Sequence, residues 1–122
     1  MWFCPECWTQ MAEQEDRCRA CGSDLQAIDR EDIERKLTRA LYHPEPLTAR
    51  RAAEILGMRR LPSAVPALVE RLRTGPDPYL AADIATALGR IGSGEARTAL
   101  VALCRHASVV VRHAAERALA EA

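Results

Sequence analysis

Apolar residues after about residue 25 recur three or four positions apart, which is the spacing of one face of an α-helix. The clearest stripe lies in residues 78–91 and consists of Leu80, Ile84, Ala87, Leu88 and Ile91. An earlier stripe consists of Ile33, Leu37, Ala40 and Leu41. A helix with such a stripe buries one face against its neighbours. The pattern therefore predicts a mainly α-helical chain after the first 26 residues.

Residues with capping side chains or special backbone preferences predict where the helices begin and end. In the first helix we expect Asp29 as N-cap, with Ile28 and Ile33 spaced as a hydrophobic staple. Pro44 and Pro46 end that helix. The other expected N-caps are Ser63, Asp77, Ser93 and Ser108, with Pro78 as a first helical residue. Glycines at positions 57, 75 and 92 are expected in C-terminal turns.

The helical pattern contains an internal repeat. Residues 51–57, RAAEILG, match residues 83–89, DIATALG, and more loosely residues 114–120, at offsets of 32 and 31. A second helix type at residues 64–72 returns 32 positions later at residues 96–103. Two helix types at one offset argue against a generic bundle and predict antiparallel helix pairs that stack into a solenoid. We expect repeat units at about residues 28–60, 61–92 and 93–122.

These repeats resemble the short HEAT-like repeats of phycobilin lyases and many prokaryotic scaffold proteins. The resemblance rests mainly on residues 50–57, RRAAEILG, and on the turn at residues 88–92, LGRIG, and it covers roughly residues 44–122. It implies a short α-solenoid of HEAT-like antiparallel helix pairs. For function, it implies only the scaffold.

The first 26 residues lack the helical pattern and contain four of the five cysteines. They form two Cys-x-x-Cys knuckles, Cys4 with Cys7 and Cys18 with Cys21, and ten residues separate the pairs. Two knuckles joined by a hairpin create a tetrahedral site of four sulfur ligands, which suits zinc. Residues 8–11 and 15–17 are the expected strands of that hairpin. Gly22 stands where a positive φ is often needed.

The knuckles resemble the zinc-ribbon family over about the first 25 residues. The resemblance implies a structural zinc ion held by Cys4, Cys7, Cys18 and Cys21. A ribbon of this size buries too little apolar surface to fold alone, so the metal would supply its folding energy. Iron in a rubredoxin-like site is an alternative, but the loop is short and lacks the aromatic core of that family. Two disulfides are the other alternative.

A signal peptide has a basic segment followed by an apolar one, and the start of this chain has no such pattern. No apolar run approaches the roughly 18 residues that a membrane span needs. We therefore expect a cytoplasmic protein that does not enter the membrane. Thiols stay reduced in that compartment, which argues against the two disulfides.

The formal net charge is zero, but the two parts of the chain differ in sign. Residues 1–34 contain nine acidic and three basic side chains, a net charge of −6, whereas residues 35–122 contain eight acidic and 14 basic ones, a net charge of +6. The two parts can attract each other, or the basic part can meet an acidic partner. The candidate partner-binding cluster around one helix and its following turn consists of Arg50, Arg51, Arg59 and Arg60.

We expect no enzyme, because the sequence contains no phosphate loop, nucleophile elbow or definable pair of catalytic carboxylates. Histidines at positions 43, 106 and 113 are expected to be surface or capping residues. Cys104 is expected to be a buried structural thiol. Three successive valines at positions 109–111 must leave at least one exposed, which suggests self-association through the C-terminal helix.

The sequence thus predicts a non-catalytic protein–protein interaction or scaffold module with a structural zinc site. Short solenoids bind partners on the ridged surface of their successive second helices. The ribbon either caps the apolar end of the array or recognises a partner itself. The alternative is a nucleic-acid-binding accessory protein that uses the Arg50–Arg60 cluster. The neutral net charge and the scarcity of aromatic residues for base stacking argue against that alternative.

Overall fold

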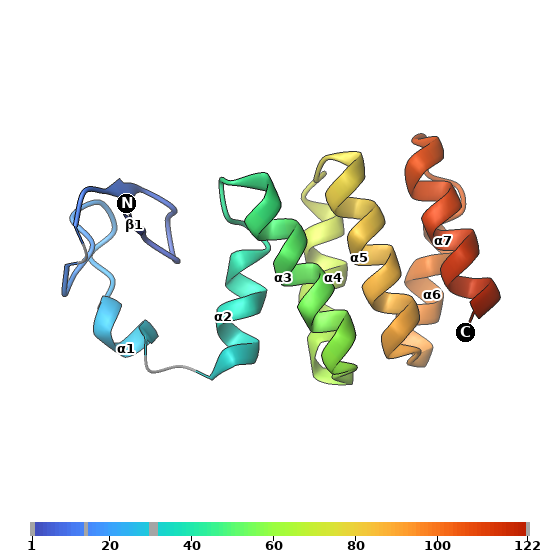
Figure 1. Ribbon diagram of the computed structural model, residues 1–122, viewed down its shortest axis with the longest axis horizontal. Helices are drawn as coiled ribbons and strands as arrows, with labels where there is room; N and C mark the ends of the chain where they lie inside the picture. The colour runs from blue at the N-terminus through green and yellow to red at the C-terminus, as the bar shows by residue number, and fades with distance from the viewer. Residues whose placement is uncertain (1, 14, 30–31, 122) are drawn as a thin grey trace.

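The computed structural model describes residues 2–13, 15–29 and 32–121. A small N-terminal lobe lies at one end of a row of helices, and the C-terminus lies at the other end (Figure 1). The lobe contains the strands β1 (Trp2–Phe3) and β2 (Gln10–Met11) and the short helix α1 (Leu25–Asp29). The chain is therefore mainly helical with a small β-element at its start, as the sequence predicts.

Each knuckle in the lobe is the loop of its own small hairpin. Strands β1 and β2 pair antiparallel around the first knuckle, with Phe3 opposite Gln10. An isolated bridge between Arg17 and Asp24 brackets the second knuckle. The expected pairing of residues 8–11 with 15–17 is therefore wrong. A knuckle reverses the chain by itself, so its two flanks pair with each other rather than with the other knuckle.

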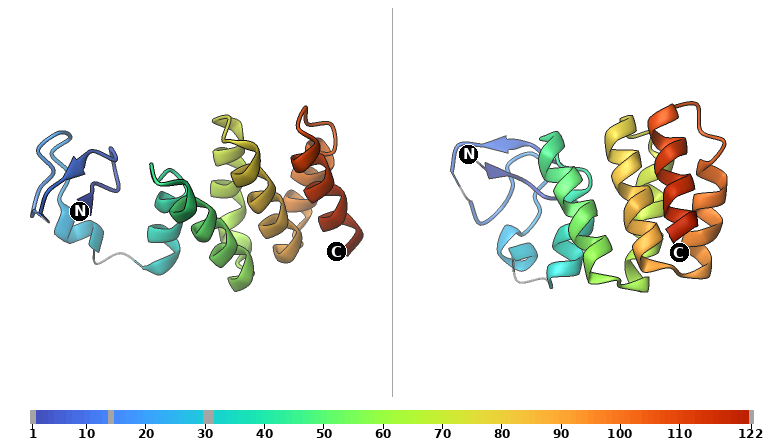
Figure 2. Two further views of the ribbon diagram at one scale, coloured as in Figure 1. Left: turned by 45° about the horizontal axis from the view of Figure 1, so that its top comes forward. Right: turned by 45° about the vertical axis from the view of Figure 1, so that its right-hand side comes forward.

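The helical part is a series of antiparallel pairs arranged in two layers. The second helices of the pairs are α3 (Pro46–Arg59), α5 (Pro78–Ile91) and α7 (Val109–Glu121). The first helices are α2 (Ile33–Ala40), α4 (Val65–Arg73), which follows the short 3₁₀ turn η1 (Pro62–Ala64), and α6 (Gly94–Leu103). Helix α5 packs between α3 and α7, and these three helices lie side by side (Figures 1 and 2).

One continuous apolar core runs between the two layers. Its largest fully buried side chains in the helical part are Leu41, Leu56, Leu68, Ile84, Leu88, Leu100, Val65 and Val111. The stripe predicted in residues 78–91 is confirmed, since Leu80, Ile84, Ala87 and Leu88 are buried and Ile91 packs against the core. In the earlier stripe Leu37 and Leu41 are buried, but Ile33 is 50% exposed, so its placement on that face was wrong.

Small residues set how closely the second helices approach. A methyl group built on Gly57 would lie 2.7 Å from the Cα of Ala87, and one built on Gly89 would lie 2.6 Å from the Cβ of Ala118. The two contacts are equivalent in successive repeats, because the glycines are 32 positions apart and the alanines 31. Gly57 was expected in a C-terminal turn, which is wrong. It lies inside α3, where the absence of a side chain allows the close approach.

Most predicted helix ends are confirmed, with clear exceptions at two N-caps. Asp77 and Ser93 cap α5 and α6 as expected, and Gly92 is the left-handed C-cap of α5. The N-cap of α2 is Asp32 rather than Asp29, which ends α1 instead. The proposed staple to Ile28 lies outside the described side chains.

Ser63 is not an N-cap. It lies in the 3₁₀ turn η1, which leads into α4, and its hydroxyl donates a hydrogen bond to the carboxylate of Glu34 at 2.7 Å. The hydroxyl thus joins the first two repeat units rather than a helix end.

Candidate metal centre

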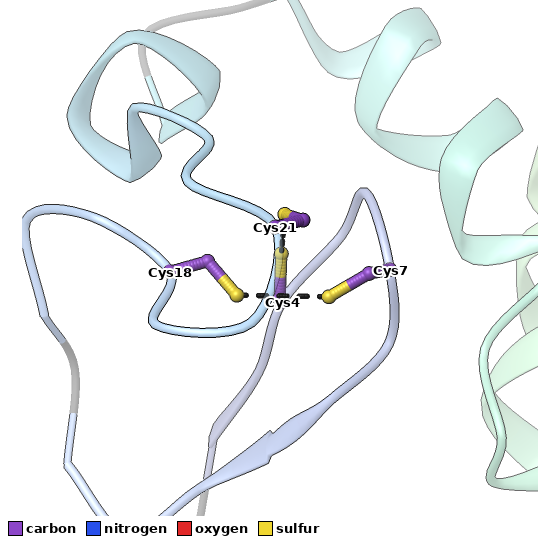
Figure 3. Close-up of side chains that lie close together, drawn as sticks. All are labelled: Cys4, Cys7, Cys18 and Cys21. Atoms are coloured by element: carbon purple, nitrogen blue, oxygen red, sulfur yellow. Dashed lines mark hydrogen bonds between the residues drawn. The ribbon is translucent and has the colours of Figure 1, made fainter.

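The four N-terminal sulfur atoms converge on one point (Figure 3). The Sγ atom of Cys4 lies 3.7 Å from that of Cys21, and the Sγ atom of Cys7 lies 3.6 Å from that of Cys18. All four sulfurs lie within 4.8 Å of one another, and none forms a disulfide. Four thiolates at tetrahedral zinc–sulfur distances would lie about 3.8 Å apart. The cluster can therefore hold one metal ion.

The two knuckles hold their sulfurs with the same backbone hydrogen bonds. The N–H of Cys4 donates to the carbonyl of Thr9 at 3.0 Å, and the N–H of Cys18 donates to the carbonyl of Ser23 at 3.1 Å. In both cases the donor is the first cysteine of a knuckle and the acceptor lies five residues later. This shared geometry brings the cysteines of each knuckle to the same side of a tight loop.

A residue with positive φ completes each loop. Gly22 has φ of 77°, as expected, and its N–H donates to the carbonyl of Cys18 at 2.9 Å. The equivalent residue in the first knuckle is Trp8, which has φ of 60° and donates to the carbonyl of Cys4 at 2.7 Å. A bulky side chain is strained in this region, and such strain persists only where other contacts hold the residue.

A hydroxyl lies beside the second, exposed cysteine of each knuckle. Oγ1 of Thr9 lies 3.1 Å from Sγ of Cys7, and Oγ of Ser23 lies 3.1 Å from Sγ of Cys21. Because a hydroxyl can donate to the thiolate, the Thr9 contact lowers the pKa of Cys7 to about 6, and the Ser23 contact lowers the pKa of Cys21. Both shifts favour the thiolate over the thiol.

The buried cysteine of the first knuckle behaves in the opposite way. Cys4 has no exposed surface, and burial raises the pKa of its thiol to about 12 without a metal ion. A buried thiolate needs a nearby cation, because burial penalises the charged form. A divalent ion at the centre of the cluster would supply that charge, and its binding would release the proton of Cys4.

The first knuckle lies against the helical part through aromatic rings. The His43 ring, in the turn before α3, meets the rings of Phe3 and Trp8 edge-on, with centroids 4.9 Å apart in both pairs. Its Nδ1 accepts a hydrogen bond from the N–H of Glu45 at 3.0 Å, which fixes the ring. These contacts hold the strained Trp8 in place. His43 was expected to be only a surface or capping residue, so this role was missed.

An ion pair supports the same contact between the lobe and the helices. A guanidinium nitrogen of Arg39, in α2, lies 2.8 Å from a carboxylate oxygen of Glu6, which stands inside the first knuckle. The partly buried Arg39 thus connects the first knuckle to the first helix pair. The lobe therefore touches the α2 end of the array through these few side chains.

The expected partner-binding arginines are in different environments. Arg50 is paired with Asp83 at 2.6 Å, and its guanidinium lies over the ring of Tyr79 at 5.6 Å from the centroid. Arg51, Arg59 and Arg60 are exposed. Arg60 is the C-cap of α3 and adopts a left-handed conformation with φ of 52°. Arg50 therefore links α3 to α5, whereas the other three are not enclosed by the array.

Two further predicted features concern the C-terminal repeat. Cys104 is the C-cap of α6 and is partly buried against the core, so it is less enclosed than the buried thiol that was expected. The three successive valines divide as predicted. Val111 is fully buried, while Val109 and Val110 are 52% and 43% exposed.

Comparison with known proteins identifies the repeats. The family model described as HEAT repeats matches residues 9–86 and again residues 67–122. Within the first match, the described residues 9–13 and 15–24 contain no helix, so the match to helical repeats rests on the residues after them. No curated protein matches the chain. Within the described part of the chain, no helix is both long and apolar enough to cross a bilayer.

Proposed function

Because the chain belongs to the HEAT-repeat family, we propose that it is a non-catalytic protein–protein interaction module whose N-terminal ribbon holds a structural zinc ion. The observation that carries this proposal is that one chain joins a HEAT-repeat array to a four-cysteine cluster. Stacked helix pairs present an ordered surface of second helices, and a four-sulfur cluster lies against their first end.

Zinc is the metal that the ligand set supports best. Four thiolates in a compact, nearly tetrahedral arrangement suit zinc or iron. The four cysteines would fill the coordination shell and leave no open position for substrate, so the ion would be structural. When bound, it would supply charge that keeps Cys4 ionised and would tie the two knuckles together. A four-thiolate metal site needs reduced cysteines, which agrees with the proposed cytoplasmic location.

The metal identity is tested by mass spectrometry of the purified chain under non-denaturing conditions. We expect one zinc ion per chain after expression in medium with both zinc and iron. An iron-loaded protein with the visible absorption of a ferric thiolate centre would replace zinc by iron in this proposal.

The interaction role is tested by affinity capture from a lysate of the source organism, with and without nuclease. A stoichiometric protein that remains after nuclease treatment would support the interaction module. Recovery that collapses with nuclease would favour the alternative, nucleic-acid binding, for which the exposed Arg51, Arg59 and Arg60 are the supporting residues.

A second candidate function is self-association, in which two copies of the chain meet through α7 at the C-terminal end of the array. The partly exposed Val109 and Val110 would be covered if two copies met there. Sedimentation of the wild type against a Val109→Ser/Val110→Ser variant tests this contact. Equal masses for the two proteins at all concentrations would count against it.

A further inference from the structure

A second basic cluster lies at the other end of the second helices from the turn that contains His43. A pocket of about 680 Å³ is lined by Arg60, Arg90, Arg97 and Arg117. We call it the arginine pocket. Of the four, only Arg60 belongs to the cluster of Arg50, Arg51, Arg59 and Arg60 that the sequence indicates.

The repeat architecture brings these four side chains together. Arg60 caps the end of α3, and Arg90 lies in the last turn of α5. Arg97 comes from α6 and Arg117 from α7. The positions are 57 residues apart along the chain at most, but adjacent repeats place them around one hollow.

Small residues form part of the wall between the arginines. Gly89 of α5 lies directly against Ala118 of α7, and both line the pocket together with Gly92 and Ala114. Small residues at these positions let the two helices meet closely, and no large side chain fills the hollow over their contact. The long arginine side chains can therefore reach a ligand that lies along this wall.

The four guanidinium groups differ from several other arginines of the array in having no partner among the described residues. Among the residues that the structure describes, none makes a hydrogen bond or ion pair with the side chains of Arg60, Arg90, Arg97 or Arg117. Glu121 is the single acidic residue that lines the pocket in the described part of the chain. Like charges placed together repel each other unless an anion neutralises them. By contrast, Arg39, Arg50 and Arg71 are engaged with other residues of the chain.

We propose that the arginine pocket binds an acidic segment of a partner protein, with carboxylates held by paired guanidinium N–H donors. Arginine suits this task because its planar fork matches a carboxylate. The inference rests on the proposed interaction function and names the binding site and the chemistry of the partner.

The surroundings favour an acidic polypeptide over a nucleic acid. No aromatic side chain lines the described part of the pocket, so bases have no ring to stack on. The rings of Tyr42 and Tyr79 lie under Arg71 and Arg50, away from the pocket.

The test is fluorescence anisotropy with a fluorescein-labelled peptide rich in Glu and Asp, using the full chain loaded with zinc. The pocket variant is Arg90→Glu/Arg117→Glu. Its matched control is Arg51→Glu/Arg59→Glu, which makes the same charge change on exposed arginines of α3. Arg59 and Arg90 each stand in the last turn of a helix, so the two variants also disturb helix ends alike.

We expect the pocket variant to lose at least about tenfold in affinity, because two charge-assisted contacts are lost and replaced by repulsion between carboxylates. The control should lose less than about threefold, and binding should weaken with salt. Helical circular dichroism must be equal in the three proteins. Equal losses in the two variants would mean general charge attraction and would overturn the inference.

Two further experiments distinguish peptide binding in the arginine pocket from nucleic-acid binding and from the proposed interaction function. An unstructured oligothymidine that binds more tightly than the peptide, with the same dependence on Arg90 and Arg117, would assign the pocket to nucleic acid and overturn the proposal. Affinity capture is repeated with both variants. A protein partner retained by the pocket variant would leave the interaction function standing and refute this pocket, whereas failure of the wild type to capture any protein would count against the proposed function itself.

Discussion

The ribbon and the helical array reach stability by different physical means. The described ribbon buries Cys4, Cys18 and Leu25, with Met11 packed beside them, and has no other apolar core. The array buries a core that continues through every helix pair. One part therefore depends on a ligand for its fold, and the other depends on packing between repeats. The comparison predicts that the two parts can be broken separately.

Loss of the metal should produce the largest effect, and only in the ribbon. Binding of a structural zinc ion is worth about 10–16 kcal/mol in small zinc domains, more than a ribbon could replace by packing. We expect Cys18→Ser, or a strong chelator, to abolish zinc binding and unfold residues 2–24. The helical circular dichroism should fall only slightly. Zinc content and amide hydrogen exchange measure the two parts independently.

Cys104→Ser is the matched control, because it removes a thiol from α6 that lies outside the cluster. It should retain one zinc ion per chain. Unchanged zinc stoichiometry in the Cys18→Ser protein would contradict the assignment of the ligands.

Deletion of core volume should produce the next largest effect, and in the array alone. Leu88 has no exposed surface, so Leu88→Ala should lower the free energy of unfolding by about 2–5 kcal/mol. Leu47, which is 68% exposed on α3, provides the control. Leu47→Ala should change the free energy of unfolding by less than about 0.5 kcal/mol. Urea denaturation of the zinc-loaded chain measures both. A loss below about 1 kcal/mol for Leu88→Ala would mean that the helical stripe is misassigned.

Crowding the contact between repeats should have a smaller effect. The added methyl group of Gly89→Ala would meet Ala118 at 2.6 Å, and overpacking of this kind costs about 1–3 kcal/mol. The gain in helix propensity offsets about 1 kcal/mol of that cost. We expect a net loss of about 1 kcal/mol, measured by urea denaturation.

Two comparisons sharpen this prediction about the repeat contact. In the Gly94→Ala control, the added methyl group meets nothing within 4 Å, so stability should not fall. The double variant Gly89→Ala/Ala118→Gly moves the methyl group from one helix to the other and should recover part of the loss. A Gly89→Ala protein as stable as the wild type would show that the helices can separate at no cost.

The fold could be predicted largely because its information is local and periodic. The helix stripe and the 32-residue offset are visible in the chain, and the caps at Asp77 and Ser93 follow from side-chain chemistry next to each helix. The errors came where two local solutions compete. Asp29 and Asp32 are both good N-caps, and in the structure only the second one caps α2.

The sequence could not show which role Gly57 has, because glycine is common both in turns and at close contacts between helices. Its environment depends on Ala87 in the next repeat, which no local pattern reveals. In the metal centre the cysteines follow from knuckle spacing. A hydroxyl follows each knuckle in the sequence, at Thr9 and Ser23, but only the folded loops show that it lies beside a sulfur.

The contacts that involve several repeats were out of reach for the same reason. His43 meets Phe3 and Trp8 only once the ribbon is placed on the array. Likewise, Arg60 and Arg117 share a pocket only because the helix pairs stack side by side. Sequence patterns located each residue on its element, and the packing of elements decided which residues meet.

The smallest predicted effect concerns the contact between the two regions. His43→Ala removes both ring contacts and should weaken ribbon docking by about 1 kcal/mol, because an edge-to-face pair contributes roughly 0.5–1.5 kcal/mol and this contact is partly exposed. His113→Ala, at an exposed position of α7, is the control. The measurement is the chemical shift of the Trp8 indole N–H in the zinc-loaded protein. We expect a clear shift in His43→Ala and none in His113→Ala, with zinc content and array stability unchanged in both.

A fall in zinc content on His43→Ala would mean instead that docking helps to fold the metal centre, because the His43 ring holds Trp8 in the left-handed conformation that the first knuckle requires. The two regions would then share one folding equilibrium.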